Sequence, residues 1–453
     1  MSREQRAESR EQRAESREQR AESLNYARIG IVGLGYVGLT LAIAAADSGF
    51  EVYGREINQR IKSALKANHA HFHETGLDAL IAKHNNQKFF CVDEFPEDNN
   101  KKFDAFIITV GTPLKAGTHS PNFDYIRQAI QSIKKVYDGT QLIILRSTVS
   151  VGTTRNIILP FLRDLCGKNE VFVSMCPERT VEGRAIEELT HLPQIISGNN
   201  EKALKLAEEI FTHITKSVIK VDSLEEAELA KLYCNTYRDI HFAIGNAFCL
   251  AAQTFGIDGI RVIQHANEGY SRANIAIPGF VAGPCLEKDA YILAHNMKDC
   301  PSKKFILSAR EISSSLEKSV VEWVKQKISG KIITLSGMAF KGRPETSDLR
   351  GSSSVNIARD LFALGYELRL HDFVADIDEM NELKLGRAYK NLSEACEGSD
   401  ALLILNNHEK YLNVTRSETG NLIILDAWQV CRNINNSFTL GNMLLTGGCE
   451  NCA

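Results

Sequence analysis

The sequence lacks any apolar run that approaches the length of a membrane-spanning helix, and its first residues lack the apolar core of a secretory signal. It also lacks a strong excess of charge of either sign, because its formal net charge is only -3 over 453 residues. A chain with so small a net charge has no electrostatic reason to bind nucleic acid or an anionic membrane. We therefore expect a protein with no membrane and no nucleic acid among its partners.

The sequence also lacks an evenly paired set of cysteines. Eleven cysteines are scattered along the chain, and this odd number is typical of free thiols in a reducing compartment. We therefore expect a cytoplasmic protein. Cys449 and Cys452 form a CxxC pair near the end of the chain. Because no second Cys/His pair lies near it, we predict no metal site there.

The first residues form a tandem repeat. Ser-Arg-Glu-Gln-Arg-Ala-Glu occurs three times over residues 2–22, with two Arg and two Glu in each repeat. These charges could support a lone helix through i,i+4 pairs, but alanine is the only apolar residue available for a coiled-coil seam. We predict a disordered, charged extension over residues 1–24.

A glycine-rich turn follows the first hydrophobic segment, at residues 27–32. In the run from Gly33 to Gly38, Gly33 suits the tight turn and Gly35 allows a pyrophosphate to approach the backbone. Gly38 allows the next helix, predicted to end near Ser48, to pack closely on the strand. The N-terminus of that helix carries a partial positive charge for the phosphates. This pattern predicts a dinucleotide-binding domain.

A second predicted strand ends at Glu56, about where the carboxylate that binds the ribose hydroxyls is expected. A carboxylate there repels a 2'-phosphate, so we predict NAD as the cofactor, although the adjacent Arg55 leaves NADP as an alternative. Thr112 and Thr148 follow two later strands and are candidate cofactor contacts; ordinary turn chemistry is the alternative. The complete set of predicted cofactor-binding residues is Gly33, Gly35, Tyr36, Val37, Gly38, Glu56, Arg60, Thr112 and Thr148.

The remaining pattern predicts an α/β fold in which two Rossmann-like, doubly wound domains are joined by a central helical domain. Strands are expected at residues 105–110, 142–145 and 171–174 of the first domain. In the last domain they are expected at 332–335, 367–370, 401–405 and 422–425, with a helix over 352–364. We place the domain boundaries at 25–222, 223–320 and 321–453.

Three further clusters carry candidate chemistry. Glu178 follows a strand and could act as a base, or it could be a surface carboxylate opposite Arg179. Lys231 and Asn235 are spaced i,i+4, so one helix face presents an ammonium and an amide to a single oxyanion. Arg238 follows three residues after Asn235 and extends this face, which could alternatively be merely solvated.

Cys285 is the candidate nucleophile. Lys288 and Asp289 follow it closely, so we expect neighbouring cations to lower the pKa of its thiol and Asp289 to orient or deprotonate a water. Gly283 would let a substrate approach the backbone. A thiol can hold an aldehyde as a thiohemiacetal, which still carries a hydride to give up. With a nicotinamide cofactor, Cys285 could take an alcohol to an acid; the alternative is a buried structural cysteine.

These landmarks together resemble the UDP-glucose/GDP-mannose dehydrogenase family from residue 27 to about residue 435. The matching positions are Gly33 to Gly38, Gly111-Thr112-Pro113, Ser147-Thr148-Val149, Pro177-Glu178, Lys231, Asn235, Gly283-Pro284-Cys285-Leu286, Lys288-Asp289, Phe340-Lys341 and Asp348-Leu349-Arg350. The resemblance implies an NAD-dependent, four-electron oxidation of the C6 alcohol of a nucleotide sugar to a uronic acid, through an aldehyde and a cysteine thioester.

Residue roles also follow from the resemblance. It implies Cys285 as nucleophile, Lys231 and Asn235 as oxyanion stabilisers, Asp289 as the group that activates water, and Glu178 as an aid to thioester hydrolysis. Lys341 and Arg350 would reach the nucleotide sugar, Arg350 from the partner subunit of a homodimer or larger homo-oligomer built on the central helices. The predicted substrate-binding set is Arg179, Arg238, Lys288, Gly283, Lys341 and Arg350.

The Glu178 cluster and the Lys231/Asn235 cluster resemble those of members that oxidise UDP-N-acetylmannosamine or UDP-N-acetylglucosamine, because Arg179 directly follows Glu178 and Arg238 lies three residues after Asn235. UDP-glucose is the alternative substrate. Three positions depart from the commoner family pattern, namely Ala282, Ala290 and Ser313. Ser313 puts one expected contact near the subunit interface in doubt.

Two other classes fit less well. A two-electron dehydrogenase of the 3-hydroxyacid or 6-phosphogluconate type also joins a Rossmann domain to a Lys/Asn helix face, but it needs neither Cys285 nor a third domain. An inactive binding or regulatory protein would be expected to lose Cys285, Lys231 or Asp289, and this chain has all three.

Overall fold

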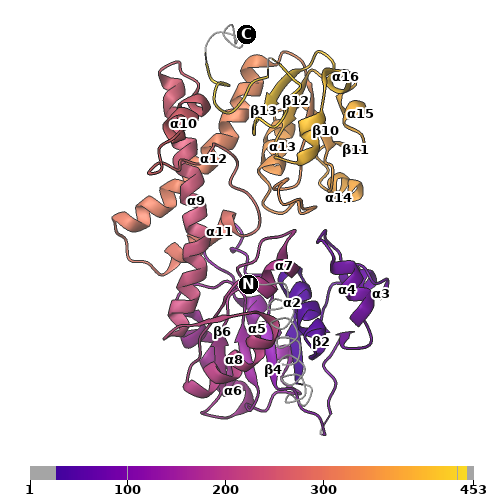
Figure 1. Cartoon of the computed structure of the whole chain (residues 1–453), viewed down its shortest axis with the longest axis vertical. Helices are drawn as coiled ribbons and strands as arrows, with labels where there is room; N and C mark the ends of the chain where they lie inside the picture. The colour runs from indigo at the N-terminus through magenta and orange to yellow at the C-terminus, as the bar shows by residue number, and fades with distance from the viewer. Residues whose placement is uncertain (1–26, 99, 436, 446–453) are drawn as a thin grey trace, which may run out of the picture. The chain divides into compact units, whose positions relative to one another are not determined.

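The computed structural model describes residues 27–98, 100–435 and 437–445, whose helices and strands are drawn in Figure 1. The predicted extension at residues 1–24 and the CxxC pair lie outside these residues. The chain divides into two compact units. Of the described residues, the first unit contains those within 27–112, 122–180 and 184–228, and the second contains those within 113–121, 181–183 and 229–445.

A parallel sheet of six strands forms the first unit, in the order β3-β2-β1-β4-β5-β6. The strands are short, and β1, β4, β5 and β6 are buried along their whole length, as expected for apolar strands covered on both faces. Their bounds are Arg28–Val32 (β1), Glu51–Arg55 (β2), Phe89–Val92 (β3), Ala105–Ile108 (β4), Leu142–Leu145 (β5) and Phe172–Met175 (β6).

Helices alternate with these strands along the chain, and the apolar faces of several of them, α2, α4 and α8 included, join the sheet in one core that includes Ile31, Leu41 and Phe211. They are α2 (Tyr36–Asp47), α3 (Gln59–Lys66), α4 (Leu77–His84), α5 (Asp124–Ser132), a π-helical turn (Thr154–Ile158), α6 (Leu159–Cys166), α7 (Ala185–His191) and α8 (Glu201–Ile214). A separate parallel pair is formed by β7 (Gln194–Ile196) and β8 (Val218–Lys220).

The strand order reverses at β1, because Val32 pairs with Arg55 on one side and with Ile108 on the other. Ligands of open α/β sheets bind beyond the carboxyl ends of the strands at such a switch point. The run from Gly33 to Gly38 follows β1 directly, so the sheet places the predicted cofactor loop at this crevice.

The second unit combines long helices with a smaller parallel sheet, in the order β11-β10-β9-β12-β13. α9 (Leu224–Thr254) begins in the first unit and continues into the second. The other helices are α10 (Gly259–Asn267), α11 (Leu286–His295), α12 (Pro301–Lys327), α13 (Ser353–Ala363), α14 (Ile377–Glu382), α15 (Leu392–Cys396), a 3-10 turn (Glu409–Asn413) and α16 (Arg416–Thr419). The strands are β9 (Ile332–Ser336), β10 (Glu367–His371), β11 (Arg387–Tyr389), β12 (Ala401–Ile404) and β13 (Ile423–Asp426).

The structure therefore has the predicted fold class, with two parallel sheets and helices between them in the sequence. Some details differ. The strand expected over 105–110 ends at Ile108, and the short strands β3, β7, β8 and β11 were not predicted. The boundary expected after residue 320 falls inside α12, whose Trp323 packs in one core with Leu335 and Leu403 of the C-terminal sheet. Among the described residues, no helix is both long and apolar enough to cross a membrane.

Gly38 gives the most direct test of how β1 and α2 pack. A Cβ atom at this position would lie 1.9 Å from the carbonyl oxygen of Gly33, which is a backbone atom that cannot move aside cheaply. Gly38→Ala should therefore lower the free energy of unfolding by about 1–3 kcal/mol, measured by denaturant unfolding of the purified protein.

Gly35→Ala is the matched control within the same loop. A Cβ atom at Gly35 meets no atom within 4 Å, and the residue has an ordinary φ of -62°. This variant should unfold within about 0.5 kcal/mol of the wild type. Equal stabilities of the two variants would show that close packing at Gly38 is not required.

Candidate active site

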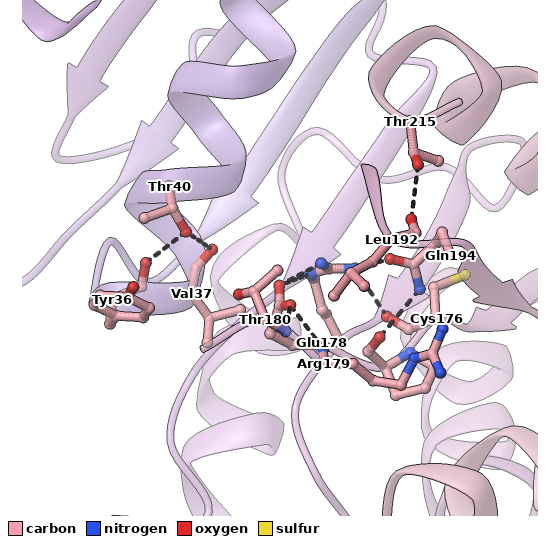
Figure 2. Close-up of polar contacts among 12 residues, drawn as sticks. Tyr36, Val37, Thr40, Cys176, Glu178, Arg179, Thr180, Leu192, Gln194 and Thr215 are labelled. Carbon is pink, nitrogen blue, oxygen red and sulfur yellow. Dashed lines mark hydrogen bonds and ion pairs between the residues drawn. The ribbon is translucent and has the colours of Figure 1, made fainter. Parts of the chain in front are cut away.

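The cofactor side of the site begins at the glycine loop. Gly33 has a φ of +92°, which favours glycine, and the space in front of Gly35 is open, as a bound pyrophosphate requires. Tyr36 and Val37 open α2, whose N-terminal end has no side-chain cap (Figure 2). The uncapped N–H groups and the helix dipole fit a phosphate at this end.

Glu56 lies beside the glycine loop. Its buried carboxylate accepts a hydrogen bond from the backbone N–H of Leu34 at 2.7 Å and from those of Ile57 and Asn58 at 2.8 Å each. A carboxylate has about four acceptor sites, so ribose hydroxyls could still bind. Arg55 instead donates from Nε to the carbonyl of Asp93 at 2.9 Å. Arg60 is exposed in the first turn of α3.

The two threonine candidates are brought together at the ends of β4 and β5. The hydroxyl of Thr112 donates a hydrogen bond of 2.6 Å to the carbonyl oxygen of Thr148, and Thr112 is buried. This contact places both residues at the carboxyl edge of the sheet that also carries the glycine loop.

Glu178 is held in a buried ion pair of the first unit (Figure 2). Its Oε2 accepts from Nε of Arg146 at 2.9 Å, and its Oε1 accepts from the backbone N–H groups of Arg179 and Thr180 at 2.7 Å each. The partner is thus Arg146, which the sequence did not single out, and not the side chain of Arg179. The guanidinium of Arg179 donates to the carbonyl of Pro193.

The second unit holds the candidate thiol site. Asn235 of α9 donates from Nδ2 to Oδ2 of Asp289 at 2.6 Å, and Lys288 donates from Nζ to Oδ1 of Asp289 at 2.7 Å. Lys231 lies one turn before Asn235 on α9, and both are buried. Cys285 is exposed and immediately precedes α11, which carries Lys288 and Asp289.

The position after Lys231 and Asn235 on the buried face of α9 is occupied by Asp239, whereas the sequence predicted Arg238 there. Arg238 is exposed, whereas Asp239, one turn after Asn235, is buried. The buried stripe of α9 therefore runs through Lys231, Asn235 and Asp239, because residues four apart stack on one helix face.

The pKa of the Cys285 thiol is raised above its ordinary value. The residue as a whole is exposed, but desolvation of its sulfur by the protein atoms around it is the largest cause, and the carboxylates of Asp289 and Glu182 act in the same direction. The ammonium groups of Lys231 and Lys288 lower the pKa but do not prevail. The expectation that neighbouring cations would give a net lowering is therefore wrong, because it left out desolvation and the carboxylates.

Glu182 is a residue of this site that the sequence did not reveal. Burial raises the pKa of its carboxyl to about 7, and the nearby Asp348 carboxylate adds to the shift. Lys341 donates from Nζ to the backbone carbonyl of Glu182 at 2.7 Å. The only local signal is its place in the loop after Glu178, and loop carboxylates are too common to be informative.

Arg350 of the same chain belongs to this cluster as well. It donates from Nε to Asp348 Oδ1 at 2.9 Å and from a terminal nitrogen to Asp348 Oδ2 at 2.6 Å. The hydrogen-bonded Asp348 carboxylate is the largest cause that raises the pKa of Arg350, and the charges of Glu182 and Cys285 add to it, so the guanidinium lies within electrostatic reach of the thiol. Gly283, with a φ of +98°, gives the backbone turn before Cys285.

No group of three metal-ligating side chains that could hold a metal ion occurs in the described ranges.

Comparison with known proteins identifies the family of the chain. Sequence models of the UDP-glucose/GDP-mannose dehydrogenase family match residues 27–215 as the NAD binding domain, 225–314 as the central domain and 334–433 as the UDP binding domain. A UDP-N-acetyl-D-mannosamine dehydrogenase of Methanocaldococcus jannaschii is 32% identical over 87% of this chain and 89% of its own length.

Two further proteins are similar over most of their length. An NDP-N-acetyl-D-galactosaminuronic acid dehydrogenase of Ralstonia solanacearum is 27% identical over 89% of this chain and 96% of its own. The solved structure of a UDP-D-ManNAc dehydrogenase from Pyrococcus horikoshii has a TM-score of 0.80 at 30% identity, and the match covers 92% of this chain and 99% of that one. The chain therefore belongs to the UDP-glucose/GDP-mannose dehydrogenase family and is an NAD-dependent nucleotide-sugar dehydrogenase.

Proposed function

We propose that this enzyme oxidises the C6 alcohol of a UDP-N-acetylhexosamine to the uronic acid, with UDP-N-acetylmannosamine as its preferred substrate. The main support for the four-electron chemistry is that the charges of Lys231 and Asp289 act on the Cys285 thiol and that Asn235 is hydrogen-bonded to Asp289. The name of the Methanocaldococcus jannaschii relative, UDP-N-acetyl-D-mannosamine dehydrogenase, supports this choice of sugar.

The proposed reaction has three changes at C6. The alcohol first loses a hydride and a proton and becomes an aldehyde. The Cys285 sulfur then bonds to the aldehyde carbon while the thiol proton passes to the aldehyde oxygen, and the resulting thiohemiacetal loses a second hydride and its hydroxyl proton to become a thioester. Water finally breaks the carbon–sulfur bond, which releases the acid and restores the thiol. When bound, NAD accepts one hydride in each oxidation, and Gly33, Gly35, Tyr36, Val37, Glu56, Thr112 and Thr148 are the residues that would hold it.

Lys231 and Asn235 would stabilise the oxygen that becomes negative when the thiol adds to the aldehyde. The Asn235 amide has two N–H donors and uses one for Asp289, so one remains for the oxyanion. The Lys231 ammonium supplies further donors from the preceding turn of the same helix. Donors held in place before the charge develops are the usual source of such stabilisation.

Glu182 is better suited than Glu178 or Asp289 to take the proton from the attacking water. Its pKa of about 7 is close to that of an effective general base near neutral pH. Glu178 is already bound by Arg146 and two backbone N–H groups, and Asp289 is bound by Asn235 and Lys288. We therefore propose that Asp289 orients its two partners and that Glu182 deprotonates the water.

The cations of the site would bind the nucleotide sugar. Lys341 and Arg350 lie beside Glu182, so we propose that they contact the sugar near C6. A second copy of the chain is the proposed partner in solution. In its support, α9 and α12 expose a groove of 710 Å³ that is lined by apolar side chains, among them Tyr233, Tyr237 and Phe305.

Cys285→Ser tests the thioester route. A serine hydroxyl is far less ionised than a thiol near neutral pH, so this variant should bind NAD and UDP-sugar but form acid about a thousandfold more slowly or worse. Acid formation is measured by mass spectrometry of the sugar product, and binding by calorimetry.

Cys234→Ser is the control for this experiment, because Cys234 is also exposed and free but lies on α9. It should form acid at the wild-type rate. Acid formation by Cys285→Ser at a rate close to that of this control would rule out the covalent mechanism.

Arg238→Leu tests the choice of sugar. The Arg238 guanidinium lies three residues beyond Asn235 on α9 and can donate to the carbonyl of an acetamido group, which glucose lacks. Because Arg238 is exposed, we expect its loss to narrow the preference for UDP-N-acetylmannosamine over UDP-glucose by about fivefold, equivalent to about 1 kcal/mol. The measurement is the ratio of kcat/KM for the two sugars. A wild type that uses UDP-glucose equally well would refute the assigned sugar and leave the four-electron chemistry untouched.

A further inference from the structure

A buried ion pair lies one helical turn beyond the thiol site. Arg310 of α12 donates from a terminal nitrogen to Oδ1 of Asp239 at 2.7 Å, and their side chains are only 5% and 1% exposed. The same Arg310 nitrogen lies 3.4 Å from the carbonyl oxygen of Leu286, the residue that follows Cys285. One guanidinium therefore joins α9, α12 and the first residue of α11.

This pair is a poor stabiliser of the fold by itself. Oδ2 of Asp239 is buried and has no hydrogen-bond partner among the described residues. Taking two charges out of water is costly, and an unpaired carboxylate oxygen adds to that cost. Well-packed apolar side chains of similar volume often stabilise a core at least as well. A role in geometry accounts for the pair better than a role in stability.

The geometry it fixes is that of α11 relative to α9. Asn235 and Asp289 form one bridge between these helices, with a hydrogen bond of 2.6 Å. A single bridge allows one helix to pivot about the contact. Asp239 lies one turn after Asn235, so the route from Asp239 through Arg310 to Leu286 is a second bridge. Two bridges one turn apart hold both the separation and the rotation of the helices.

The geometry points to Asp239 and Arg310 as positioning residues that set where the Cys285 sulfur stands relative to Lys231 and Asn235. Neither residue needs to touch the substrate. The inference deepens the proposed function and rests on it for the activity measurement, but not for the state of the thiol itself.

Arg310→Lys and Asp239→Asn test this assignment. Lysine keeps the charge but not the planar fork, and asparagine keeps the shape but not the charge, so both variants should fold. We expect kcat for acid formation to fall about 10- to 100-fold, with KM for the UDP-sugar little changed, because a displacement of about 1 Å can have such an effect. The double variant should be hardly worse than either single one.

Alkylation of Cys285 by iodoacetamide, followed by peptide mass spectrometry, gives a measurement that needs no substrate. The thiol should react several-fold faster in both variants, because α11 is less firmly held and the thiol less shielded. Glu322→Gln is the control, because it breaks the exposed 2.7 Å ion pair between Lys325 and Glu322 on the same helix α12. It should change neither the rate of Cys285 alkylation nor kcat for acid formation.

The outcomes separate the two proposals. Lowered thermal stability with unchanged alkylation and unchanged kcat would overturn the positioning role and leave the pair a structural feature only. Faster alkylation in both variants, in an enzyme whose wild type produces no uronic acid, would support the positioning role and contradict the proposed reaction.

Discussion

The hydrogen bond from Asn235 to Asp289 joins the two helices on which the candidate chemistry depends. α9 carries Lys231 and Asn235, and α11 begins directly after Cys285. Burying the Asp289 carboxylate is possible because Asn235 and Lys288 supply donors to its two oxygens at 2.6 and 2.7 Å. Removing either donor would leave a buried charge short of a partner, so the rest of the site depends on this contact.

The Asp289 carboxylate of this contact is also one of the charges that act on the Cys285 thiol. Shielding from water and the carboxylates of Asp289 and Glu182 keep the pKa of Cys285 high, against the pull of Lys231 and Lys288. In the proposed reaction, addition to an aldehyde moves the negative charge from sulfur to oxygen. Lys231 and Asn235 can then stabilise that oxygen, so the site favours the adduct more than the free thiolate.

Much of this arrangement was predictable because it depends on local spacing. The turn from Gly33 to Gly38 follows from the residues that a strand–turn–helix connection needs, and the i,i+4 spacing places Lys231 and Asn235 on one face of a helix. Arg238 shows the limit of such reasoning. Spacing alone placed it on the face of Lys231 and Asn235, but Arg238 is exposed and Asp239 holds the buried position one turn after Asn235, so a contact of Arg238 with the sugar stays a prediction.

Other features could not be predicted because they join distant parts of the chain. The ion pair between Arg146 and Glu178 depends on the order of β5 and β6 in the sheet. The proximity of the Glu182 and Asp348 carboxylates depends on the loop at residues 181–183, which belongs to the second unit. The direction of the Cys285 pKa shift depends on desolvation, which no sequence motif reports. The short strands β3 and β11 lack a long apolar run and owe their place to neighbouring strands.

In the proposed reaction, Cys285 captures the aldehyde formed in the first oxidation and holds it through the second, so no aldehyde is released. The most direct measurement is the amount of NADH formed per molecule of UDP-N-acetylmannosamine consumed, with the product identified by mass spectrometry. We expect two NADH for each sugar and uronic acid as the product. One NADH per sugar, with free aldehyde in solution, would contradict it.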